Sequence, residues 1–217
     1  MKIFPSLGAA PLTNLAGLVN ELVSAGADGV HFDIEDGVFM PMMSLGTRLI
    51  AQLRPLTTLP FDVHLSMVNP EWILPELAAM GANHVAVHSE ACGYPHRTLR
   101  LIHERGMRSG LAFNPATPLP DLRYLLPVLD YVLILTTDPE YPGATFLPEV
   151  LGKIRLGRGM LPGDSAIEWI VDGGVDEHNL PLIVKSGATG IVTGRSAFQG
   201  GRIEENLTRL RQAASRP

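Results

Sequence analysis

The chain of 217 residues has a single cysteine, Cys92, which excludes an internal disulfide. A chain without disulfides suits a reducing compartment, so we expect a cytoplasmic location. Long apolar runs are also missing, and no stretch approaches the length of a membrane span. Residues 1–4 lead into Pro5 and Ser6 with neither a basic region nor a long apolar region, so we expect no secretory signal.

Charge is also scarce. Charged residues make up 18% of the chain, the net charge is −5, and lysine and arginine form no cluster. This balance argues against nucleic-acid or membrane partners. Hydrophobic residues make up 46% of the chain, which is enough for a large core. The length suits a single α/β domain over residues 1–217.

What the chain does contain is a repeated unit. A helix-like segment ends in Gly-Ala, followed by a polar residue and an apolar run, at 26–30, 81–85 and 187–191. Glycine ends helices readily because it tolerates positive φ, and the run after it is typical of a strand buried in a parallel sheet. Strands are predicted at 2–4, 29–34, 61–65, 84–88, 109–113, 131–135, 167–171 and 190–193. Helices are predicted at 12–24, 72–80, 98–105, 148–154 and 204–212.

Eight strands alternating with helices favour a TIM (β/α)8 barrel of one domain. An open doubly wound sheet is the alternative, and it is disfavoured because no Gly-x-Gly-x-x-Gly follows an early strand. In a barrel of this kind, functional residues lie in the loops after the strands.

Four polar residues stand at the C-terminal ends of predicted strands: His31, Asp33, His64 and Asp172. Residues i and i+2 of a strand share a face, so His31 and Asp33 should point the same way. Two imidazoles and two carboxylates at one rim would form a divalent-metal site. The carboxylates could also transfer protons, so we interpret the chain as an enzyme.

Glycine turns follow the last two predicted strands. Asp172 is followed by Gly173 and Gly174, and Gly194 follows the eighth strand. Glycines allow backbone amides to approach an anion closely, and these two loops often bind phosphate in such barrels.

Four motifs together resemble those of the ribulose-phosphate 3-epimerase family. They are His-x-Asp-x-x-Asp-Gly at 31–37, Asp-x-His-Leu at 62–65, Asn-Pro-x-Thr-Pro at 114–118 and Asp-Gly-Gly-Val at 172–175. Residues 5–7 and 146–154 match as well. The resemblance is therefore collinear over nearly the whole chain.

The resemblance implies an isomerase that inverts C3 of a ketose phosphate, D-ribulose 5-phosphate/D-xylulose 5-phosphate or a related sugar phosphate, in a homo-oligomer of two to six subunits. It implies Zn²⁺ or Fe²⁺, with Mn²⁺ or Co²⁺ as alternatives, held by His31, Asp33, His64 and Asp172. Asp33 and Asp172 would exchange the C3 proton on opposite faces through an enediolate. The implied substrate and phosphate contacts are Ser6, His64, Gly143, Asp172, Gly173, Gly174 and Gly194.

The chain departs from the family near the reacting carbons. Glu35, Ser66 and Leu135 stand where the family usually has methionines that form an apolar cap. After the eighth strand, Arg195 replaces a serine, and its planar guanidinium could strengthen phosphate binding.

The loop after the sixth predicted strand departs further. Residues 138–144 replace the family pattern Asn-Pro-Gly-Phe-Gly-Gly-Gln, with Tyr141 in place of phenylalanine. Glu140 adds negative charge and Pro142 removes flexibility. Together the departures resemble a less characterised branch of the family, and they make Glu35, Ser66 and Tyr141 the candidate specificity residues.

Two other functions stay open: a non-catalytic sugar-phosphate binding protein, and another lyase or isomerase on a phosphate-binding barrel. A related decarboxylase would have lysine at the position of Glu35. A Schiff-base aldolase needs a lysine inside the barrel, but the only lysines are Lys2, Lys153 and Lys185, and none ends a strand.

The remaining polar and bulky residues receive structural interpretations. Asp62 either orients an imidazole or is a plain strand-end carboxylate. Asn114 is expected to be structural, with substrate contact as the alternative. Residues Met40, Met42 and Met43 suggest an apolar loop, with a substrate lid or a subunit contact as alternatives. We expect structural or solvent-exposed roles for His84, His88, His96, His103 and His178, and packing against the barrel for Trp72 and Trp169.

Overall fold

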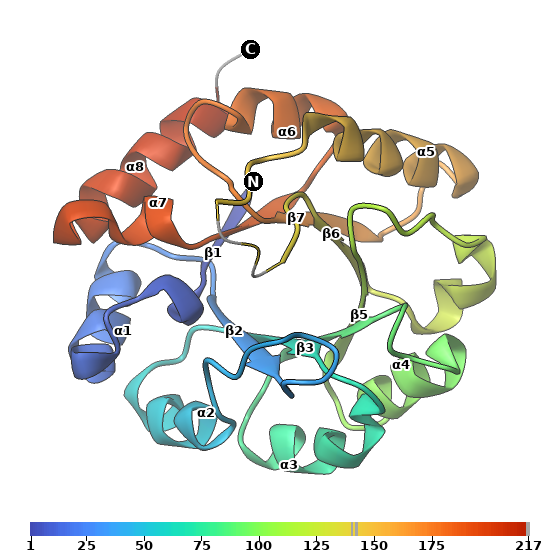
Figure 1. The fold of residues 1–217 in the computed structure, drawn as a ribbon, viewed down its shortest axis with the longest axis horizontal. Coiled ribbons are helices and arrows are strands. Elements are labelled where there is room, and N and C mark those ends of the chain that lie inside the picture. Colours follow the sequence, from blue (N-terminus) through green and yellow to red (C-terminus); the bar gives the residue numbers. More distant parts are fainter. Residues whose placement is uncertain (140, 142, 216–217) are drawn as a thin grey trace.

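The apolar runs form eight parallel strands that curve into a barrel (Figure 1). The computed structural model describes residues 1–139, 141 and 143–215. The strand order is β1-β8-β7-β6-β5-β4-β3-β2, so the TIM (β/α)8 barrel is confirmed. The strands are β1 Lys2–Pro5, β2 Val30–Glu35, β3 Phe61–Ser66, β4 His84–His88, β5 Arg108–Phe113, β6 Tyr131–Leu135, β7 Glu168–Asp172 and β8 Gly190–Thr193.

The seam between β1 and β2 closes the barrel beside the polar residues. An isolated bridge between Ser6 and His31 crosses this seam, and the Asp28 N–H donates to the Ile3 carbonyl at 3.0 Å. Asp28 supports the seam from below, because its Oδ2 accepts the Ile3 N–H at 2.9 Å. The closure therefore brings the end of β1 next to the His31 strand.

The helices surround the barrel (Figure 1). They are α1 Leu15–Ser24, α2 Arg48–Leu53, α3 Leu74–Ala79, α4 Pro95–His103, α5 Gly152–Met160, α6 Leu180–Ser186, α7 Arg195–Phe198 and α8 Ile203–Ala214. The helix predicted at 12–24 begins as the 3-10 turn Leu12–Asn14, and the helix predicted at 98–105 begins earlier, at Pro95. Proline suits the first turn of a helix because the N–H group that it lacks would have no hydrogen-bond partner within the helix there. None of the described helices is long and apolar enough to cross a membrane.

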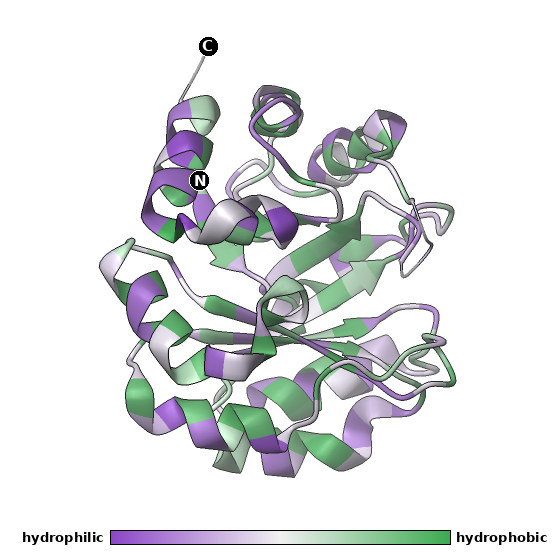
Figure 2. Cartoon of the chain, turned by 60° about the vertical axis from the view of Figure 1, so that its left-hand side comes forward, coloured by the Kyte–Doolittle hydropathy of each residue, from purple (hydrophilic) through white to green (hydrophobic). Residues whose placement is uncertain are grey.

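Two apolar layers hold the fold. The larger lies between the sheet and the helices, and Figure 2 shows hydrophobic strands at the centre with mixed helices outside. Trp169 belongs to this layer and is 1% exposed, as predicted. Trp72 is 64% exposed, so its predicted packing is wrong. It lies in the 3-10 turn Pro70–Ile73, where three residues per turn put Pro70 and Ile73 together on the buried face.

The second layer fills the barrel interior and positions the site. It consists of Phe4, Ala86, Ala112, Tyr131, Leu133, Leu135, Ile170 and Val192. Because side chains alternate along a strand, the residue two positions further on shares the interior face. Those next residues are Ser6, directly after β1, His88 at the end of β4 and Asp172 at the end of β7. The interior is thus apolar at one level and polar at the C-terminal rim.

Candidate active site

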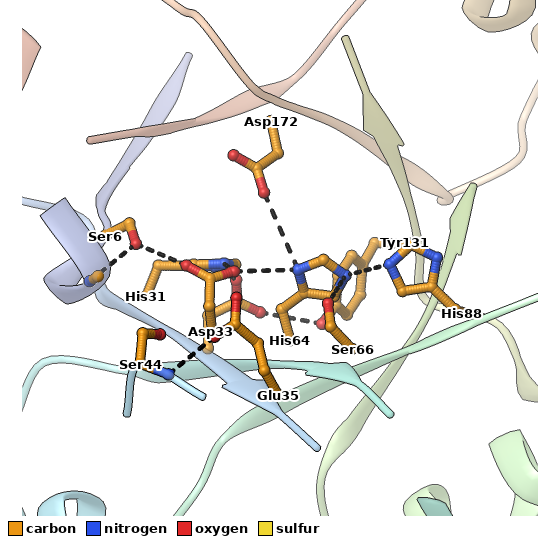
Figure 3. A network of polar contacts seen from close by, with 12 residues as sticks. Ser6, His31, Asp33, Glu35, Ser44, His64, Ser66, His88, Tyr131 and Asp172 are labelled. Carbon is orange, nitrogen blue, oxygen red and sulfur yellow. Dashed lines mark hydrogen bonds and ion pairs between the residues drawn. The ribbon is translucent and has the colours of Figure 1, made fainter. Parts of the chain in front are cut away.

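The strands β2, β3 and β7 bring His31, Asp33, His64 and Asp172 together, with Asp172 as the last residue of its strand (Figure 3). One donor atom from each residue lies within 4.8 Å of the others. Oδ1 of Asp33 is at the centre, 3.1 Å from Nε2 of His31 and 3.1 Å from Nδ1 of His64. Oδ2 of Asp172 lies 4.0 Å from the same His64 nitrogen. These four residues come from three different strands and form one cluster.

Hydrogen bonds behind the cluster hold two of its members in place. Asp33 accepts the Ser6 hydroxyl on its second oxygen, at 2.7 Å. Nδ1 of His31 lies 2.7 Å from Oδ2 of Asp62, and the other Asp62 oxygen accepts the Tyr131 hydroxyl at 2.9 Å. The structure therefore supports the orienting role for Asp62 over the plain strand-end carboxylate.

A third histidine, His88, contacts His64 from the far side (Figure 3). Their Nε2 atoms are 2.9 Å apart, and Nδ1 of His88 lies 3.1 Å from Oε2 of Glu90. The expectation of a purely structural or solvent-exposed His88 missed this contact with the cluster. The available signal was its position at the end of a strand, two residues beyond an interior alanine.

The two carboxylates of the cluster have opposite pKa shifts. Burial alone would raise the pKa of Asp33, but His31 and His64 outweigh burial and hold it well below its usual range. Burial raises the pKa of Asp172, and the negative charge of Asp33 adds to the increase. Burial would lower the pKa of His31, but Asp33 and Asp62 raise it well above its usual range. A pair of carboxylates with divergent pKa values suits separate acid and base roles.

The donor set suits a divalent cation. Two imidazole nitrogens and two carboxylates are ligands that Zn²⁺ and Fe²⁺ accept. A ligating histidine commonly presents its other ring nitrogen to a carboxylate, as His31 does to Asp62. Positive charge at the centre would also relieve the repulsion between Asp33 and Asp172 that raises the pKa of Asp172.

The cluster opens into a cavity of about 500 Å³. It is large enough for a small phosphorylated sugar. Ten of the sequence-predicted residues line it: Ser6, Asp33, Glu35, His64, Ser66, Asp172, Gly173, Gly174, Gly194 and Arg195. The prediction that these loops face one space at the C-terminal rim agrees with this geometry.

The Gly173 turn needs glycine. Its φ is +107°, and an added Cβ would lie 2.4 Å from Oγ1 of Thr137. Gly174 also has positive φ, at +65°. The chain after β7 can therefore turn tightly at the cavity wall, and no side chain covers its backbone at these two glycines.

Two predicted contacts lie apart from the cavity wall. Gly143 and Tyr141 are both exposed and are not among its lining residues, and Tyr141 is 68% exposed. Glu140 and Pro142, to which we attributed charge and rigidity, lie outside the described residues. The roles of this loop stay predictions.

The cavity wall formed by the ends of β2 and β3 and by the loop after β2 mixes polar and apolar groups. Glu35 and Ser66 are register partners at the ends of β2 and β3, and both line the cavity. Oε2 of Glu35 accepts the Ser44 N–H at 2.9 Å. Met40 and Met42 line the cavity too, whereas Met43 is 76% exposed. Met40 and Met42 thus add apolar surface to the wall that also contains Glu35 and Ser66.

Sequence comparison identifies the family. The sequence model of the Ribulose-phosphate 3 epimerase family matches residues 2–198. The chain belongs to this family. It is 34% identical over 213 residues to Ribulose-phosphate 3-epimerase of Bacillus subtilis, covering 97% of this chain and 98% of that protein. It is 38% identical over 214 residues to Ribulose-phosphate 3-epimerase of Synechocystis sp., with 97% and 93% covered. The resemblance inferred from the motifs is confirmed.

Solved structures agree on the fold. Orotidine 5'-phosphate decarboxylase from Pyrococcus horikoshii matches with a TM-score of 0.67 at 15% identity, covering 99% of this chain and 100% of that chain. N-(5'-phosphoribosyl)anthranilate isomerase from Pyrococcus furiosus matches with a TM-score of 0.65 at 18% identity, covering 99% and 98%. At such identities the likeness establishes the barrel alone.

Proposed function

We propose that this member of the family is a metal-dependent epimerase that inverts C3 of a ketose phosphate, with D-ribulose 5-phosphate as the first candidate substrate. The observation that carries the proposal is the pair Asp33 and Asp172. Their carboxyl groups belong to one cluster, and both residues line the same cavity. The names and sequences of the relatives support the same reaction.

The two carboxylates would act as the acid and the base. Inversion of a carbon beside a ketone needs one group to remove its proton and another to return a proton to the opposite face. Asp33 on β2 would serve one face of C3 and Asp172 on β7 the other, one removing the proton and the other returning one. The roles exchange in the reverse reaction.

His31, Asp33, His64 and Asp172 would hold the divalent metal ion, for which we propose Zn²⁺ or Fe²⁺. When bound, the ion supplies positive charge that stabilises negative charge developing on the substrate oxygens. Ser6 would keep Asp33 oriented, because its hydroxyl donates a hydrogen bond to Oδ2 of Asp33.

The loops after β7 and β8 would bind the phosphate. Gly173, Gly174, Gly194 and Arg195 all line the cavity, and Arg195 would add a positive charge to these loops. Glu35 and Ser66 would contact the sugar and select among ketose phosphates. Residues 1–217 would act as one catalytic domain.

Deuterium exchange tests the proposal. Metal-loaded protein is incubated in D₂O with pentulose and hexulose phosphates, and NMR follows the C3 proton. We expect exchange at C3 and formation of the C3 epimer for at least one substrate. Absence of C3 exchange on every ketose phosphate would refute the proposal.

A chelator separates the enzyme from a non-catalytic binder. Removal of the metal should abolish exchange in the epimerase. A protein that only binds sugar phosphate through its glycine loops would show no exchange before or after chelation and would keep most of its phosphate affinity.

A further inference from the structure

We infer that His88 is a positioning residue for His64: held by Glu90, it fixes the hydrogen of His64 on Nε2 and leaves Nδ1 free to face the cluster. The inference rests on the proposed metal site, since it concerns how one proposed ligand is prepared. It gives a role to a histidine and a glutamate that the proposed chemistry does not use.

The contacts form a chain that leads away from the cavity (Figure 3). Nε2 of His64 lies 2.9 Å from Nε2 of His88, and Nδ1 of His88 lies 3.1 Å from Oε2 of Glu90. The His88 ring is fully buried and lies against Phe39, with 4.7 Å between ring centroids. His88 is therefore fixed in position between an apolar ring and its two polar partners.

The hydrogens on this chain follow from what each partner can do. An ionised carboxylate only accepts hydrogen bonds, so Nδ1 of His88 must carry the hydrogen that Glu90 receives. A neutral His88 then presents a lone pair on Nε2. His64 must donate from its own Nε2, because two facing lone pairs would repel. The opposite nitrogen of His64, Nδ1, lies 3.1 Å from Oδ1 of Asp33, and a metal ion held by both residues would take the place of the hydrogen that otherwise joins them.

Glu90 is itself held by the Asn-Pro-x-Thr-Pro motif. Its Oε1 accepts the Asn114 N–H at 2.8 Å, and the Thr117 side chain also hydrogen-bonds to it. Nζ of Lys153 donates to the Asn114 carbonyl at 2.7 Å, which ties the motif to α5. Residues 114–118 thus act on the cluster through Glu90 and His88.

The arrangement parallels the support of His31 but differs in charge. His31 faces the Asp62 carboxylate directly. His64 instead faces a neutral imidazole, and the carboxylate of Glu90 lies one ring further away. His64 is oriented without another buried anion beside Asp33 and Asp172. Such outer partners commonly change metal affinity by about 10- to 100-fold.

Zn²⁺ affinity, measured by competition with a chromogenic chelator, tests the role without substrate. His88→Leu removes the acceptor at 2.9 Å and leaves only the Ser66 hydroxyl, 3.5 Å from Nε2 of His64, and we expect it to weaken Zn²⁺ binding about tenfold or more. His88→Gln can place a carbonyl oxygen where Nε2 lies, and we expect it to stay within about threefold of the wild type. His103→Gln is the matched control, because His103 also pairs with a carboxylate, Asp130, but on the outer surface.

The outcomes decide the inference. Wild-type affinity in a folded His88→Leu variant would overturn it. So would an equal loss in His88→Gln and His88→Leu, because that result would indicate that the imidazole ring shape alone matters.

The tautomers give a second readout that needs no variant to fold. Imidazole ¹H–¹⁵N correlation spectra of the wild type should show His88 with its hydrogen on Nδ1 and none on Nε2, with or without Zn²⁺. With Zn²⁺ bound, His64 should carry hydrogen only on Nε2. A hydrogen on Nε2 of His88 would overturn the inference. Failure of the wild type to bind Zn²⁺, with these His88 tautomers intact, would count against the proposed metal site instead.

Discussion

Asp33 and Asp172 face one another from β2 and β7, with an oxygen of each inside the same 4.8 Å cluster. The shared neighbourhood moves their pKa values in opposite directions. Two histidines stabilise the ionised form of Asp33, whereas burial and the charge of Asp33 disfavour the ionised form of Asp172. The two carboxyl groups therefore differ in their electrostatic surroundings although they are the same residue type.

The first prediction concerns Glu35, which we propose helps to select the substrate. Glu35→Met restores the residue usual in the family and removes a carboxylate from the cavity wall. A hydrogen bond to a charged group contributes about 1.5–3 kcal/mol, so we expect roughly a tenfold or larger fall in kcat/KM for the preferred ketose phosphate. The ranking of pentulose and hexulose phosphates should change as well.

Glu35→Gln is the control for this variant. Its amide oxygen can still accept the Ser44 N–H, so the loop should keep its place. The same kcat/KM values across all substrates in wild type and Glu35→Met would show that Glu35 does not touch the sugar.

Arg195 should act on the phosphate and not on the chemical step. Arg195→Ser removes a cation from the cavity wall, and the exposure of Arg195 limits the effect. We expect KM to rise about fivefold with little change in kcat, and added salt to narrow the difference from wild type. Steady-state kinetics at two ionic strengths checks this, and a loss confined to kcat would contradict it.

Gly173 should be intolerant of a side chain. In Gly173→Ala the new Cβ would meet Thr137 at 2.4 Å with φ at +107°. We expect the free energy of unfolding to fall by about 1–3 kcal/mol, measured by urea denaturation. Gly163→Ala is the control, because a Cβ there meets nothing within 4 Å. Equal stabilities of the two variants would be the contrary result.

Glu90 should make stability depend on acid pH. Burial would raise its pKa, but hydrogen bonds from His88, Thr117 and Asn114 lower it to about 2 from an ordinary 4.5. Its stabilisation is therefore fully present above pH 4.5 and is lost as pH falls toward 2. Between pH 5.5 and 3.5 the wild type should lose more unfolding free energy than Glu90→Gln. Parallel pH profiles for the two proteins would contradict this role.

The repeat pattern predicted most of the barrel, since each strand is an apolar run between turn signals. Short helices such as α2 were not predicted, because six residues carry little periodicity. Trp72 was misplaced because the pattern could not show the 3-10 turn that directs it outward.

The cluster was predictable for a different reason. The sequence places His31, Asp33, His64 and Asp172 toward the C-terminal parts of apolar runs that form parallel strands, and parallel strands end at the same rim. The contact between His64 and His88 was signalled only by the position of His88 at the end of a strand, because the contact itself depends on how two side chains on adjacent strands lean toward each other. The cytoplasmic location, the homo-oligomer and the metal's identity stay predictions.

The origin of the hydrogen at C3 of the product tests the two-carboxylate account most directly. Metal-loaded protein converts D-ribulose 5-phosphate, or the preferred ketose phosphate, in D₂O, and mass spectrometry examines the first product formed. We predict that each product molecule carries solvent deuterium at C3, because the group that returns the hydrogen is not the group that removed it. Product that retains the original hydrogen would contradict the assignment of Asp33 and Asp172 to opposite faces.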